Sequence, residues 1–348
     1  MPLQTADFDY HLPAVRIAQT PIEPRDAARL LVVHRKTGAL EHRIFADLPE
    51  YLQAGDVLVA NDSRVLPARL TGHKTTGGQV EILLLKPRSE HQWEALVRGK
   101  RLRPGSVITC LAHTPGHDES LTATVAAVHD DGTRLLHFNR SPLPELEHFG
   151  EIPLPPYIHE PLHDAERYQT VYARVQGSAA APTAGLHFTP RLIARLDEAG
   201  VGFVFVTLHI GLDTFRPVQV EEIHAHHMHS EWADLSPVCA ERIQTQRAAG
   251  GRCVAVGTTA VRVLESAARH GSLDDPLPAF QGWTRLFITP GYDFRVTDAL
   301  ITNFHLPRST LLMLVSAFAG KALIERAYAE ALRHEYRFFS FGDAMLIL

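Results

Sequence analysis

The chain has 348 residues, of which 45% are hydrophobic and 21% are charged. This composition excludes a mainly disordered chain, because enough apolar surface is available to offset the entropy lost on folding. The net charge of −5, from 34 basic and 39 acidic residues, excludes a uniformly basic surface, so any nucleic-acid-binding surface must be local.

The length favours about two domains, and the two observations that follow make the cytoplasm the expected location. The longest apolar run, residues 311–320, is shorter than the about 18 residues of a membrane helix and is expected to be buried helix. The first residues include two acids and lack the basic stretch of a signal peptide. Three widely spaced cysteines, Cys110, Cys239 and Cys253, predict neither a disulfide framework nor a cysteine zinc site.

Residues 1–70 begin with two apolar runs, 30–33 and 57–60, that are typical of buried strands. From residue 71 to 149 the pattern changes to short apolar runs separated by glycine and proline turns, without helical periodicity. Evenly spaced short strands predict a small all-β barrel domain inserted into a larger one. The runs are 80–85, 93–97, 107–110, 121–128 and 135–138.

Residues 150–182 are rich in proline and small residues and are expected to form a long, functional loop. Helical and strand patterns then alternate, which predicts an α/β fold with a mostly parallel sheet, formed by residues 1–70 and 150–348 together. The expected order is helix 190–198, strand 201–208, helix 237–250, strand 253–256 and helix 260–269. Ligands bind at the carboxyl ends of such strands, which points to His209, to residues 257–259 and to the loop after an apolar run at 286–288.

Two segments have the composition of a small-molecule site. Gly257-Thr258-Thr259 lies between a strand and a helix, where free main-chain N–H groups favour a carboxylate or phosphate; a simple threonine cap on the helix is the alternative. The second segment, residues 177–189, exposes main chain through its small side chains, which suits a flat ligand such as a nucleoside, and ends in His187. A flexible linker is the competing interpretation.

Two other clusters allow a functional and a structural interpretation. The tract from His224 to His229 holds four histidines but lacks a defined metal-ligand spacing, so no metal is expected there. Residues 86–103 contain six basic side chains against two acidic ones. This strip would bind phosphate on a barrel face, or merely protect a strand edge by its charge.

Longer motifs then identify a family. The chain is similar, in order and over nearly its whole length, to the S-adenosylmethionine:tRNA ribosyltransferase-isomerases, also called epoxyqueuosine synthases. The resemblance is carried by DFDYHLP (7–13), GDVLVANDSRVLPAR (55–69), GQVEILLL (78–85), GEIPLPPYI (150–158), ERYQTVYA (166–173), TAGLHFT (183–189), MHSE (228–231), VGTT (256–259), TDALITNFHLP (297–307) and FFSFGDAM (338–345).

The resemblance implies an activity and its partners. Such an enzyme transfers and isomerises the ribosyl part of S-adenosylmethionine onto an aminomethyl-deazaguanine at the wobble position of a tRNA. It yields epoxyqueuosine, adenine and methionine, a late step of queuosine synthesis. The resemblance also implies an α/β domain with an inserted β-barrel. S-adenosylmethionine is then a cosubstrate, no cofactor is permanently bound, no metal is expected, and we expect a monomer.

Candidate residues follow for each part of this reaction. Carboxylate binding is assigned to Gly257, Thr258 and Thr259, and nucleoside binding to Thr183, Ala184, Gly185 and Phe188. A general base is needed at the ribosyl carbon next to the sulfonium, and the candidates are His187, His209, His229 and Glu231. The proton donor to the departing adenine would be Asp343 or His305. The expected tRNA contacts are Asn61, Arg64, Arg98, Lys100, Arg101 and Arg308.

The sequence departs from the family pattern at two places. Asp213 stands where the family usually has glycine, and residues 96–102 form a shortened version of a basic segment. Two other functions are alternatives to the transferase-isomerase activity. An S-adenosylmethionine-dependent RNA methyltransferase is disfavoured, because a GxGxG strand–helix entry is missing. A histidine-ligated metal hydrolase would require bound metal.

Overall fold

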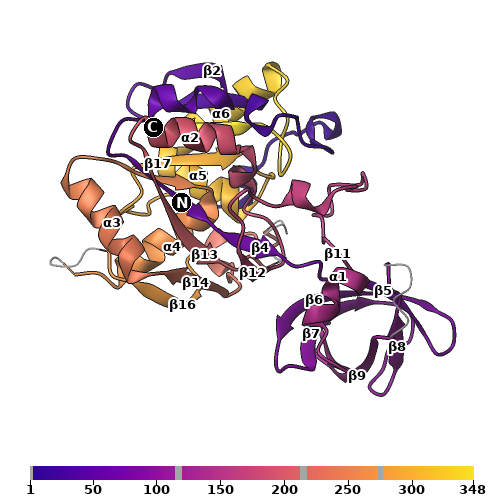
Figure 1. Ribbon diagram of the computed structural model, residues 1–348. Helices are drawn as coiled ribbons and strands as arrows, with labels where there is room; N and C mark the ends of the chain where they lie inside the picture. The colour runs from indigo at the N-terminus through magenta and orange to yellow at the C-terminus, as the bar shows by residue number, and fades with distance from the viewer. Residues whose placement is uncertain (1–2, 114–119, 212–217, 273–276) are drawn as a thin grey trace. The chain divides into compact units, whose positions relative to one another are not determined.

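The computed structural model describes residues 3–113, 120–211, 218–272 and 277–348. The chain divides into two compact units, one formed by residues 1–64 and 156–348 and the other by residues 65–155 (Figure 1). Asp213, the departure from the family pattern, lies outside the described residues.

The larger unit is built on a nine-stranded sheet. Its strands are, in spatial order, β16 (Phe280–Thr284), β14 (Glu231–Leu235), β13 (Gly202–Leu208), β3 (Val57–Asn61), β15 (Cys253–Val256), β17 (Ala299–Asn303), β18 (Ala344–Ile347), β1 (Arg29–Val33) and β2 (Leu40–Ile44). The central strands β13, β3, β15 and β17 are parallel to one another, as are β18 and β1. The remaining pairs are antiparallel.

Both faces of the central strands are buried, which explains their continuous apolar sequences. In β3, Val57 and Val59 face one hydrophobic cluster, whereas Leu58 and Ala60 face the other. Each such valine or leucine side chain contributes about 1.5–3 kcal/mol through burial. Helices α3 (Pro237–Ala248), α4 (Thr258–Arg269), α5 (Thr310–Ala319) and α6 (Lys321–Arg333) supply side chains to the first cluster, and α2 (Pro190–Glu198) to the second.

Local sequence signals set the helix starts. The Thr189 hydroxyl accepts a hydrogen bond from the Leu192 amide, and Ser236 and Ser309 do the same for the amides three residues on. Proline follows Thr189 and Ser236 at the first helical position, where its missing N–H costs nothing. None of the described helices is long and apolar enough to cross a membrane.

The smaller unit is an antiparallel barrel of six strands. Their order is β5 (Arg69–Lys74), β6 (Gln79–Pro87), β7 (Gln92–Arg98), β10 (Arg134–Phe138), β9 (Thr122–Val128) and β8 (Val107–Cys110), and β8 pairs with β5 to close the barrel. Gly72 lies at this closure, where a Cβ atom would stand 2.4 Å from the Thr109 carbonyl oxygen. Inward side chains such as Val80, Ile82 and Leu84 form a separate core. Helix α1 (Leu146–Phe149) and strand β11 (Gly150–Glu151) follow the barrel strands.

The predicted fold class is confirmed, with an α/β unit and an inserted all-β barrel. Several elements differ from expectation. The apolar run 286–288 is not a strand, because the nearby strand β16 ends at Thr284. The expected loop 150–182 includes strand β12 (Val175–Ser178), which pairs with β4 (Ser63–Val65). The sequence pattern also missed strands β2, β14, β17 and β18, each of which has an antiparallel neighbour.

Candidate active site

A pocket opens in the larger unit at the carboxyl ends of the parallel strands β15 and β17. The cavity itself is narrow, with a volume of about 60 Å³. Strand β15 leads into Gly257 and α4, and β17 leads into the segment from Thr302 to Ser309. The opposite wall comes from the 3-10 helix η7 (Thr183–His187) and from residues around Phe339. Segments far apart in sequence therefore meet at one pocket.

The start of helix α4 lines the pocket without a side-chain cap. Its N-cap is Gly257, which has φ +88° and therefore a conformation that side chains disfavour. The hydroxyl of Thr259 is buried and has no hydrogen-bond partner among the described residues. The alternative of a threonine cap is thus wrong here, and the first-turn amides of α4 are left for another acceptor.

Polar side chains connect the two walls of the pocket. The Thr183 hydroxyl donates to Asn303 Oδ1 at 2.9 Å, and Asn303 Nδ2 donates to the Phe339 carbonyl oxygen at 3.1 Å. Ala184 also lines the pocket, 3.4 Å from the position of a Cβ on Gly257. These contacts hold the small-residue segment against the ends of β15 and β17.

His305 is the one of the six catalytic candidates that lines this pocket in the described chain. One ring nitrogen, Nε2, lies 2.8 Å from the Thr302 hydroxyl, and the His305 amide donates to the Tyr328 hydroxyl at 2.9 Å. Burial lowers the pKa of His305 from 6.5 to about 3. The imidazole is consequently neutral at physiological pH.

His187 and Asp343 are held by the main chain. Both ring nitrogens of His187 face carbonyl oxygens, those of Ala184 at 3.1 Å and Gly342 at 2.9 Å, and burial lowers the pKa of this histidine. Asp343 accepts hydrogen bonds from the amides of Arg29 and Arg337 at 3.0 and 2.7 Å. Neither residue is among those lining the pocket, so this geometry gives both a structural task.

The other proposed acid–base groups also lie outside the pocket lining. His209 is partly buried against Gly177, and burial lowers its pKa. Glu231 is buried, forms an ion pair with Arg262 and accepts a hydrogen bond from the Gly211 amide at 2.9 Å. His229 is exposed.

Two of the proposed nucleoside-binding residues take part in packing instead. Phe188 is fully buried in the second hydrophobic cluster, where its ring meets Phe45 edge-on at 5.1 Å. Gly185 makes room for the ring of Tyr172, whose hydroxyl would lie 2.1 Å from a Cβ atom at that position. The pocket lining includes neither residue.

The proposed tRNA contacts fall into three groups. Asn61 is buried, and its amide side chain bonds to the Leu208 main chain, so an RNA contact is excluded by its position. Arg64 and Arg308 form surface ion pairs with Glu166 and Asp9. The remaining three are exposed around the turn after β7 in the barrel, within the shortened basic segment: Arg98, Lys100 and Arg101.

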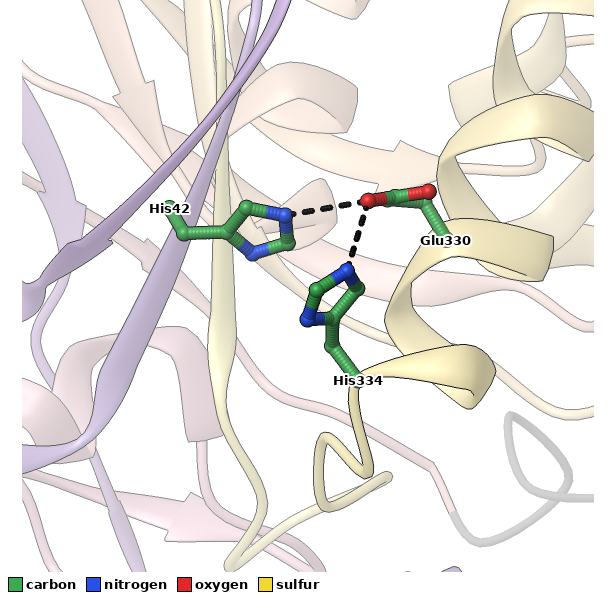
Figure 2. Close-up of side chains that lie close together, drawn as sticks. All are labelled: His42, Glu330 and His334. Atoms are coloured by element: carbon green, nitrogen blue, oxygen red, sulfur yellow. Dashed lines mark hydrogen bonds and ion pairs between the residues drawn. The ribbon is translucent and has the colours of Figure 1, made fainter.

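Histidine and carboxylate side chains meet elsewhere, at the edge of the sheet (Figure 2). Glu330 Oε1 lies 3.2 Å from His42 Nε2 and 2.9 Å from His334 Nε2. Arg333 also binds both oxygens of Glu330, at 2.7 and 2.6 Å. The carboxylate is therefore already neutralised, and the cluster is explained as a hydrogen-bond network. These residues do not belong to the 224–229 tract.

Two tyrosines for which no role was predicted lie at the pocket or contact one of its lining residues. Tyr157 lines it, and its hydroxyl lies 2.8 Å from that of Ser340, another lining residue. The Tyr10 hydroxyl donates to the His305 carbonyl oxygen. The signal for both tyrosines was present, since each lies in a motif that carried the family resemblance, but no spacing rule connects positions 10, 157 and 305.

Comparisons with known proteins show what this chain is similar to. A family model described as "Queuosine biosynthesis protein" matches residues 5–347. The S-adenosylmethionine:tRNA ribosyltransferase-isomerase of Symbiobacterium thermophilum is 56% identical over 350 residues, which cover 99% of this chain and 100% of that protein. The enzyme of the same name from Dehalococcoides mccartyi is 54% identical over 348 residues, with 99% and 100% covered.

A solved structure gives the same result. The S-adenosylmethionine tRNA ribosyltransferase of Thermotoga maritima is 42% identical, with a TM-score of 0.57, and the match covers 98% of this chain and 100% of that one. The family and the transferase-isomerase class expected from the sequence motifs are confirmed. This chain belongs to the S-adenosylmethionine:tRNA ribosyltransferase-isomerase family.

Proposed function

We propose that this chain makes epoxyqueuosine in tRNA, using the pocket at the ends of β15 and β17 for S-adenosylmethionine. The ribosyl group is transferred to the amine of an aminomethyl-deazaguanine and isomerised to an epoxycyclopentane. Adenine, methionine and one proton are released. The observation that carries the assignment is the uncapped start of α4 beside the unpartnered Thr259 hydroxyl. We expect a monomer acting in the cytoplasm.

The pocket offers complementary groups for the parts of this cosubstrate. The amides and positive dipole end of α4 suit the methionine carboxylate. Thr183 and Asn303 offer hydroxyl and amide groups for the ribose. Ala184 and Gly257 leave the main chain uncovered, which suits close approach of a nucleoside.

His305 is our candidate for moving the proton. Its neutral ring accepts a proton from the ribosyl carbon next to the sulfonium. The imidazolium so formed can pass the proton to the departing adenine. One residue would thus serve both steps, and the second proton, from the attacking amine, leaves to solvent. This scheme uses no metal-dependent step.

The test uses S-adenosylmethionine and an anticodon stem-loop that carries the aminomethyl-deazaguanine, with and without a chelator. Mass spectrometry should show gain of the ribosyl-derived group together with release of adenine and methionine, and chelation should leave turnover intact. A methyl-sized gain with S-adenosylhomocysteine would instead identify a methyltransferase. Loss of turnover on chelation, restored by zinc or iron, would favour metal chemistry.

The role of His305 is tested separately with His305→Gln. Wild-type protein should exchange the hydrogens of the ribosyl carbon next to sulfur with deuterated water, and the variant should lose at least about 100-fold of this rate, as expected for a general base. Binding of S-adenosylmethionine should remain. His224→Gln, at an exposed site, is the matched control. Unchanged exchange in His305→Gln would refute the assignment.

A further inference from the structure

A second groove in the larger unit adjoins the cosubstrate pocket. It is lined by residues 9–12 and 17, together with Tyr157, Leu306, Pro307 and Phe339. Tyr157, Leu306 and Phe339 also line the cosubstrate pocket. Two ligands bound in the two cavities would therefore be neighbours, as the two substrates of a group transfer must be.

The main chain holds the two sides of this groove in place. The Arg308 amide donates to the Phe8 carbonyl oxygen at 2.9 Å, which ties residues 305–309 to the N-terminal segment. Arg308 and Phe339 have φ values of 56° and 70°, in the left-handed region. For residues other than glycine this conformation costs about 1–2 kcal/mol, and such strain clusters at binding sites.

The lining offers flat walls and a pair of opposite charges. Tyr10 and Tyr157 line the groove, and the Tyr157 ring packs against the buried ring of Phe339, with centroids 4.8 Å apart. Aromatic walls stack against a base that has left the helical stack of an RNA loop. At the rim, Asp9 pairs with Arg308, and the two side chains are 39% and 52% exposed. Both charges remain within reach of a ligand.

We propose that this groove receives the wobble nucleotide of the RNA, with Asp9 binding its aminomethyl cation and Arg308 an adjacent phosphate. The ion pair of the free protein opens, and each partner meets an opposite charge of the same nucleotide. A surface ion pair of this kind contributes only about 0–1 kcal/mol, so its opening costs little. This inference rests on the proposed function, because it takes the substrate from it.

The test compares the affinities of the protein for two anticodon stem-loops. One carries the aminomethyl-deazaguanine, and in the other a neutral methyl group replaces the aminomethyl group of the same base. Wild type should bind the aminomethyl RNA about tenfold more tightly, the effect of a hydrogen bond to a charged group. Asp9→Asn should abolish this preference and leave the affinity for S-adenosylmethionine unchanged. Arg308→Gln should weaken both RNAs equally and reduce the salt dependence of binding by about one ion.

Glu325→Gln, which removes the same charge from the exposed Lys321–Glu325 pair, is the matched control and should behave as wild type. Retention of the tenfold preference in a folded Asp9→Asn variant would overturn the inference. If wild type turns over the modified stem-loop but shows no preference, the groove assignment fails while the proposed function stands. If wild type does not turn it over, the proposed function itself fails.

Discussion

At the residue scale, local hydrogen bonding decides which candidates can do chemistry. His187 and His305 are both buried histidines near the ends of the sheet strands, yet they differ in what surrounds the ring. His187 faces two main-chain carbonyls, whereas His305 meets a hydroxyl within the pocket. The His187 ring therefore links the segments of Ala184 and Gly342. The His305 ring lies at the pocket wall, where it is accessible to a ligand.

Asp343 illustrates the structural alternative. Asp343→Ala removes the acceptor of two amides, which would be left unsatisfied at about 1–3 kcal/mol each. We expect a loss of about 3 kcal/mol in the free energy of unfolding, measured by urea denaturation, while the folded fraction keeps its turnover number. A variant of full stability without turnover would instead make Asp343 a chemical group.

The low pKa of His305 predicts a pH-dependent stability. The unfolded chain binds a proton near pH 6.5, whereas the folded protein does so near pH 3. Between these values the unfolded state holds the extra proton, so stability falls as pH falls, by up to about 1.4 kcal/mol per pH unit.

His305→Gln removes this contribution. Urea unfolding at pH 7, 6 and 5 should therefore show a shallower loss of stability on acidification in the variant than in wild type. His224→Gln should follow the wild-type curve. Parallel curves for wild type and His305→Gln would contradict the low pKa of His305.

At the element scale, the strand-to-helix connection at Gly257 shapes the proposed cosubstrate site. β15 is central and parallel to β3 and β17, so its carboxyl end and the start of α4 meet the ends of its neighbours. A helix without a side-chain cap, in a pocket, is incomplete until an acceptor arrives. Under the proposed function, S-adenosylmethionine supplies this acceptor.

Thr259→Val tests whether the hydroxyl at the start of α4 serves ligand binding or the fold. Its hydroxyl makes no hydrogen bond among the described residues, so the variant should lose no stability in thermal unfolding. The KM for S-adenosylmethionine should rise about tenfold, the typical value of one hydrogen bond to a charged group. Thr245→Val, on the exposed part of α3, serves as control. A destabilised variant with an unchanged KM would show that the hydroxyl serves the fold.

At the scale of the whole molecule, the two units have separate cores and different surfaces. The acidic net charge of the chain makes a local basic surface necessary for RNA. In the barrel, Arg98, Lys100 and Arg101 are exposed together after β7. A charged turn of this kind can bind phosphates without contributing to the barrel core.

Replacing these three residues by glutamine should raise the KM for the stem-loop and leave that for S-adenosylmethionine unchanged. The slope of log affinity against log salt concentration should become shallower by about 2, since each phosphate contact to single-stranded RNA contributes about 0.7. The matched control replaces Lys321, Arg326 and Arg333 of α6. An equal effect of both triple variants would mean that only net charge matters.

The sequence predicted elements whose signals are local. Helix α2 and strand β15 have the predicted bounds, because proline, caps and continuous apolar runs mark them within a few residues. Strands β17 and β18, which are antiparallel to each other, were missed. Their pairing joins residues far apart in the chain, and such pairing leaves no short-range signal.

For the site, the sequence by itself determined the family and the reaction class, since contiguous motifs carry them. It also pointed to Gly257, whereas Thr258 and Thr259 belong to the first turn of α4 and not to a turn before it. Only the tertiary structure showed that His305 lines the pocket while the other acid–base candidates do not. It also showed that Phe188 is buried in the core and that Tyr157 packs against Phe339. The physical reason is that burial and hydrogen-bond partners come from distant segments. A histidine's pKa and its access to a ligand depend on those neighbours, and the linear sequence does not contain them.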